Sequence, residues 1–136
     1  MRAVVDVNVL ISATLSARDP SAEVIRSCRD GAFELVLSEL LIAELTRALG
    51  YPKIRKRIPP ENAAAFTSWV RNHGTIADDP PDPSSVRSPD PDDDYLLVLA
   101  ISARSYLVTG DQHLLGLEAD LPIHTPAEFL TKLQGD

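Results

Sequence analysis

Four carboxylates in this chain could do chemistry together: Asp6, Glu44, Asp93 and Asp111. Asp6 ends a short apolar run that is typical of a buried β-strand, and Asp111 closely follows a second such run, residues 106–109. Because parallel strands end at the same edge of a sheet, we expect these two side chains at one edge, where such sheets bind their ligands. A buried aspartate there is costly unless a positive or hydrogen-bonding group meets it.

Glu44 lies on a predicted helix over residues 39–49, which follows a predicted strand directly. Its spacing from Leu41, Leu45 and Ala48 completes a helical apolar stripe, so Glu44 is expected on the buried side of that helix. An unpaired glutamate on an apolar stripe is uncommon. We therefore expect this carboxylate near the same sheet edge.

Asp93 belongs to the acidic run 92–94, which begins a predicted helix that is apolar on nearly every face. The helical period favours Asp93 over its neighbours, since it stacks one turn before Leu96 and Leu97. Three other aspartates lie within three residues of Asp93, namely Asp90, Asp92 and Asp94.

Carboxylates that converge on a partly buried edge repel one another unless they are protonated or neutralised by a cation. Oxygen ligands favour a hard cation, Mg²⁺ or Mn²⁺, and the three histidines and Cys28 show no zinc-binding spacing. Such a site supports metal-assisted hydrolysis of a phosphodiester. Taken singly, Asp6 and Asp111 could instead be helix caps, and the run 92–94 could simply complement a helix dipole.

Composition indicates one ordinary globular domain, residues 1–136, with 44% hydrophobic and 24% charged residues. No apolar run approaches a membrane span, no signal-peptide pattern precedes the first strand, and a single cysteine excludes an internal disulfide. The cytoplasm is the expected compartment. The net charge of −7 excludes a uniformly basic nucleic-acid binder, although residues 53–57 form a local basic run.

Strands and helices alternate along the predicted chain. The predicted strands are the opening run ending at Asp6, then 33–37, 75–77, 106–109 and 121–124. The predicted helices are 20–30, 39–49, 60–73, 92–104, 112–117 and one beginning at Pro126, with a helical turn and loop at 12–19 and a loop at 78–91. This order predicts an α/β fold, a three-layer α/β/α sandwich around a parallel sheet of about five strands.

The same segments resemble the PIN domain family over nearly the whole chain. The resemblance lies in residues 4–12, Ser38 with Glu44, 90–100, 106–115 and the C-terminal ending 125–130, and the Val-Thr-Gly-Asp segment at 108–111 is its most specific part. Val7 departs from the family pattern, which commonly has threonine there.

The resemblance implies a metal-dependent ribonuclease, often the toxin of a toxin–antitoxin pair, inhibited by a small partner protein. It further implies Mg²⁺ or Mn²⁺ as cofactor, RNA as substrate and a homodimer, without a membrane. By position, the acidic tetrad would be Asp6, Glu44, Asp93 and Asp111, and the supporting polar residues would be Asn8, Ser38 and Thr109.

Two other functions remain open at this stage. A non-catalytic binding module could keep the fold with an idle acidic site. A Mg²⁺-dependent phosphoryl-transfer enzyme is less well supported, because Asn8 occupies the position where such an enzyme needs a second aspartate. A receiver domain is also less well supported, because it needs a lysine after a later strand and no lysine lies between Lys56 and Lys132.

Overall fold

The computed structural model describes residues 1–78, 94–111, 115 and 122–135. Within these residues, five strands form one parallel sheet in the order β3-β2-β1-β4-β5. Their bounds are β1 (Arg2–Val5), β2 (Glu34–Leu37), β3 (Thr75–Ile76), β4 (Tyr106–Val108) and β5 (Ile123–His124). The predicted parallel sheet of about five strands is confirmed.

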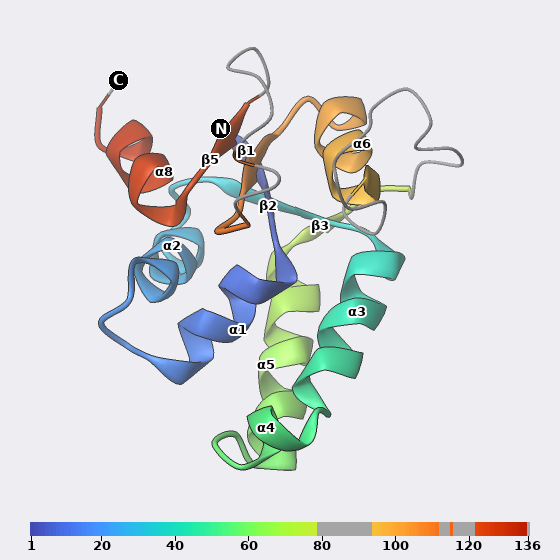
Figure 1. Ribbon diagram of the computed structural model, residues 1–136. Helices are drawn as coiled ribbons and strands as arrows, with labels where there is room; N and C mark the ends of the chain where they lie inside the picture. Colours follow the sequence, from blue (N-terminus) through green and yellow to red (C-terminus); the bar gives the residue numbers. More distant parts are fainter. Residues whose placement is uncertain (79–93, 112–114, 116–121, 136) are drawn as a thin grey trace.

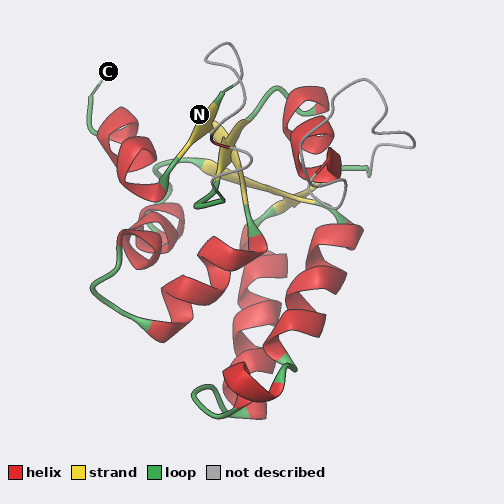
Figure 2. Cartoon of the chain, in the orientation of Figure 1, coloured by secondary structure: helices red, strands yellow, loops and turns green. Residues whose placement is uncertain are grey.

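Helices cover both faces of the sheet (Figure 1, Figure 2). The described helices are α1 (Val7–Leu15), α2 (Pro20–Arg29), α3 (Glu39–Leu49), α4 (Pro52–Arg55), α5 (Pro60–His73), α6 (Asp94–Ser102) and α8 (Pro126–Leu133). Successive strands β1, β2 and β3 run outward in one direction, and the chain then returns through α6 to β4 on the other side of β1. Right-handed crossovers therefore place α6 on the opposite face from α1, α3 and α5, which confirms the three-layer sandwich.

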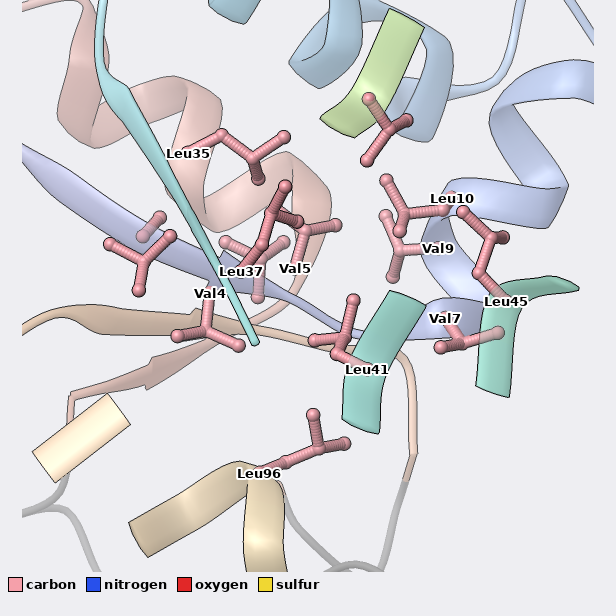
Figure 3. Close-up of a cluster of buried hydrophobic side chains, with 14 of the residues drawn as sticks. Val4, Val5, Val7, Val9, Leu10, Leu35, Leu37, Leu41, Leu45 and Leu96 are labelled. Carbon is pink, nitrogen blue, oxygen red and sulfur yellow. The ribbon is translucent and has the colours of Figure 1, made fainter. Parts of the chain in front are cut away.

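The core lies between the sheet and the helices that pack on it. Leu41 and Leu45 of α3 belong to the same buried cluster as Val9 and Leu10 of α1 (Figure 3). Since these side chains are almost entirely removed from water, the start of α1 is fixed against α3 at the carboxyl end of β1. None of the helices in the described residues is long and apolar enough to cross a membrane.

Several predicted helix starts are confirmed by their caps. The hydroxyl of Ser38 accepts a hydrogen bond from the Leu41 N–H (3.2 Å) at the start of α3. At the start of α8, Thr125 and Glu128 form a reciprocal capping box of 3.1 and 2.8 Å.

Two helices of the structure were not predicted. The stretch from Val7 onward is helix α1, whereas the sequence predicted only a helical turn and loop at 12–19. Residues 9–11 are all apolar and buried, so their sequence shows no helical periodicity that would distinguish a helix from a strand. The short helix α4, which lies within the basic run, was also not predicted.

Most of the predicted loop at 78–91 and of the predicted helix at 112–117 lies outside the described residues.

Candidate active site

Asp6 stands at the junction of β1 and α1, where it is 6% exposed. One carboxylate oxygen accepts the N–H of Asn8 (3.2 Å), which makes Asp6 the N-cap of α1. The other accepts the hydroxyl of Thr109 (2.7 Å), just past the end of β4. These two donors and the positive end of the α1 dipole stabilise the buried carboxylate. The alternative interpretation of Asp6 as a helix cap is therefore correct. Asp6 also lines a pocket.

Burial raises the pKa of Asp6 above its usual value. Hydrogen bonds from Thr109 and Asn8 act in the opposite direction, and the nearby charge of Asp111 raises the pKa further. Burial prevails in this balance, so Asp6 ionises less readily than an exposed aspartate. A cation in contact with this carboxylate would relieve that penalty.

Asp111 is connected to Asp6 through Thr109. The backbone N–H of Asp111 donates to the Thr109 hydroxyl (3.0 Å), which itself donates to Asp6. Thr109 is fully buried, so this link between the ends of β1 and β4 is removed from water. The structure thus brings together Asp6, Thr109 and Asp111 at one sheet edge, where the sequence places them.

Glu44 is less buried than its position on the apolar stripe suggests. Leu41, Leu45 and Ala48 are buried as expected, but the Glu44 side chain is 35% exposed. It forms an ion pair with Arg47, three residues along α3. Sequence reasoning did not single out Arg47, although the i, i+3 spacing of opposite charges on a helix was the signal for it.

One pocket of about 510 Å³ joins α1, α3 and the start of α6 at the carboxyl edge of the sheet. Its lining residues are Asp6, Val7, Asn8, Leu40, Glu44, Arg47, Ala48, Tyr51, Tyr95 and Leu96. Asp111 lines a neighbouring pocket of about 380 Å³, and Asn8 lines both. The predicted residues Asp6, Asn8 and Glu44 therefore share one cavity, with Asp111 beside it.

The two remaining predicted site residues are Asp93 and Ser38. Asp93 lies outside the described residues, although Tyr95 and Leu96, which follow it in the chain, line the pocket. Ser38 is buried and caps α3. Within the described part of the chain, no three acidic, histidine or cysteine side chains group closely enough to hold a metal by themselves.

The family of this chain follows from a comparison with family models. The model described as PIN domain matches residues 2–113, which contain all the site residues above. The chain belongs to the PIN domain family.

Two solved structures are similar in fold to this chain. The crystal structure of PAE2754 from Pyrobaculum aerophilum superposes with a TM-score of 0.70 at 20% identity, covering 100% of this chain and 91% of that one. VapBC2 from Rickettsia felis, bound to a DNA fragment from its promoter, gives a TM-score of 0.64 at 14% identity, covering 92% and 98%. No curated protein matches the chain.

Proposed function

We propose that this PIN domain is a Mg²⁺- or Mn²⁺-dependent endoribonuclease. The observation that carries the proposal is the buried carboxylate of Asp6, whose pKa is raised by burial and which shares a pocket with Glu44. PIN domains are generally nucleases, and the oxygen donors of this pocket suit a hard divalent cation.

In this proposal, Asp6 and Glu44 hold the cation, with Asp93 and Asp111 completing the acidic tetrad. The bound cation would lower the pKa of a water and neutralise charge on the leaving oxygen. The protein's own contribution is orientation: the Thr109 hydroxyl and the Asn8 N–H fix the two oxygens of Asp6 before any ligand arrives.

The direct test is cleavage of a labelled single-stranded RNA by the purified chain with Mn²⁺, Mg²⁺ or EDTA. Cleavage with either cation and none in EDTA is expected. A binding module with an idle site would neither cleave nor gain thermal stability with millimolar Mn²⁺, and that pair of results would contradict the proposal.

Replacing Thr109 by Val is expected to weaken Mn²⁺ binding by about 10- to 100-fold, since it removes the hydroxyl that orients Asp6 but keeps the shape of the side chain. Thr109→Ser retains the hydroxyl and is expected to bind Mn²⁺ nearly as the parent does. Calorimetric titration with Mn²⁺ measures both. Equal affinities for Thr109→Val and the parent would show that Thr109 does not position the ligand.

We further propose that the nuclease acts in the cytoplasm as a toxin restrained by a small antitoxin, and that it forms a homodimer. The support is the family membership together with the similarity in fold to VapBC2, which is described as bound to DNA from its own promoter. Co-expression with the product of the adjacent gene tests the partner: a stable complex with suppressed RNA cleavage is expected. Light scattering of the purified chain tests the dimer.

A further inference from the structure

The pocket at Asp6 continues as a groove along one face of α3. Its α3 residues Leu40, Glu44, Arg47 and Ala48 follow helical spacing, and Tyr51 extends this row just beyond the helix. At 1.5 Å per residue, the row from Leu40 to Ala48 alone spans about 12 Å. We call this feature, from Asp6 to Tyr51, the α3 groove. It is long enough to hold an extended chain rather than a single small ion.

Directly after Tyr51, the chain enters its most basic run. Lys53, Arg55, Lys56 and Arg57 are all exposed, so four of the 13 lysines and arginines fall within five consecutive residues of a chain with net charge −7. Arg57 donates to the backbone carbonyl of Leu15 (3.2 Å), which ties this basic turn to the end of α1. The acidic end of the groove therefore suits a cation, and the basic turn that follows Tyr51 in the chain suits an anion.

An aromatic side chain lies at the end of the groove, next to the basic turn. Tyr51 is 44% exposed, lines the groove and directly precedes the short helix α4. The guanidinium carbon of Arg47 lies 6.0 Å from the centre of its ring. An exposed ring beside cations is the arrangement with which proteins hold single-stranded nucleic acid, since bases stack on the ring and the cations follow the phosphates.

We propose that the α3 groove is the binding track for a single strand of RNA, with one base stacked on Tyr51 and the adjoining phosphates at Arg47 and the basic turn. The choice of RNA rests on the proposed function. A strand held in this way brings a phosphodiester to Asp6 and Glu44 at the other end of the groove. Bases of a duplex are stacked inside the helix and do not reach a ring on the protein surface, so the groove selects single strands.

Binding without cleavage tests the track. A fluorescein-labelled ten-nucleotide oligouridylate is titrated with the full chain in EDTA, and its anisotropy is followed. Tyr51→Leu is expected to weaken binding by about 5- to 150-fold, the range expected for one lost stacking contact, whereas Tyr51→Phe keeps the ring and the affinity. Equal binding by Tyr51→Leu and the parent would overturn the proposal.

The basic turn is tested by salt dependence. The double variant Lys53→Gln, Lys56→Gln is expected to bind more weakly and to lower the slope of log K against log salt by about 1.4, if both side chains contact phosphates of a single strand. Arg104→Gln is the control, because Arg104 is also exposed but lines a different pocket at the opposite edge of the sheet. An identical slope in the double variant and the control would overturn the role of the turn.

The outcomes separate the track from the nuclease activity. If no cation supports cleavage and Tyr51→Leu still loses binding, the track stands and the proposed nuclease function fails. If the parent cleaves RNA while Tyr51→Leu binds and cleaves as well as the parent, the nuclease stands and the track is wrong. No binding of the oligouridylate by the parent, or equal affinity for an RNA duplex of the same length, would also overturn the track.

Discussion

Asp6→Asn is expected to lower Mn²⁺-dependent RNA cleavage by at least about 100-fold. Loss of a group that merely orients a metal ligand lowers activity by 10- to 100-fold, and Asp6 is proposed as a ligand itself. An amide has the same shape as the carboxylate but no charge for the cation. The measurement is the initial cleavage rate at saturating Mn²⁺, with Asp30→Asn as control, because Asp30 is an exposed carboxylate at the end of α2.

The same variant is expected to gain stability relative to the metal-free parent as the pH rises. Because burial raises the pKa of Asp6, the folded protein binds this proton more tightly than the unfolded chain does. The free energy of unfolding contributed by Asp6 is therefore greatest below the ordinary value of 3.8 and declines as the pH rises through the raised pKa. Because asparagine does not ionise, the free energy of unfolding of Asp6→Asn does not decline in this way.

The pH dependence provides the decisive comparison for Asp6. The difference in melting temperature between Asp6→Asn and the parent, measured in EDTA from pH 4 to pH 8, is expected to grow with pH in favour of the variant. Millimolar Mn²⁺ is expected to stabilise the parent and not the variant, because only the parent binds it. A difference in melting temperature that does not change with pH, together with stabilisation of the variant by Mn²⁺, would contradict the assignment of Asp6.

The position of Asp6 relative to Asp111 could be predicted from the sequence because it depends only on strand direction. Two aspartates that follow parallel strands must meet at one edge, whatever the order of the strands. Thr109 lies between them in space for the same reason, as the first residue beyond β4. The caps at Ser38 and Thr125 were predictable since capping is decided within four residues.

The groove was not predictable in this way because it depends on what packs around α3. Helix α1 was missed, since its buried run 9–11 has no period, and without α1 the sequence does not show which helix forms the other wall. The exposure of Glu44 likewise depends on how far α6 and α1 cover α3. Periodicity gives the side of a helix on which a residue lies, but the depth of its burial is set by neighbouring elements.

Helix α8 extends the structure beyond the segment that matches the family model, which ends at residue 113. It packs against α2 and β5, and its one fully buried side chain among the described residues is Phe129. The Phe129 ring lies edge-on to Phe33, with centroids 5.0 Å apart, and 6.0 Å from the ring of Tyr106. These contacts join α8 to the segments that begin β2 and β4.

Phe129→Ala is therefore expected to lower the free energy of unfolding of the whole chain by about 3–5 kcal/mol, the usual loss for a phenylalanine removed from a core. We propose that residues 1–136 unfold as one domain, so the loss should appear as a shift of a single transition in urea, followed by circular dichroism and by Trp69 fluorescence. Phe129→Leu keeps most of the buried volume and is the control, with a smaller loss. Trp69 lies on α5 and reports on that part of the chain. If Phe129→Ala instead produced a separate early transition, seen by circular dichroism but not by Trp69 fluorescence, helix α8 would unfold independently of the rest. Coincident transitions shifted together would show that the C-terminal helix helps to hold β1 and β4, and with them Asp6 and Thr109, in place.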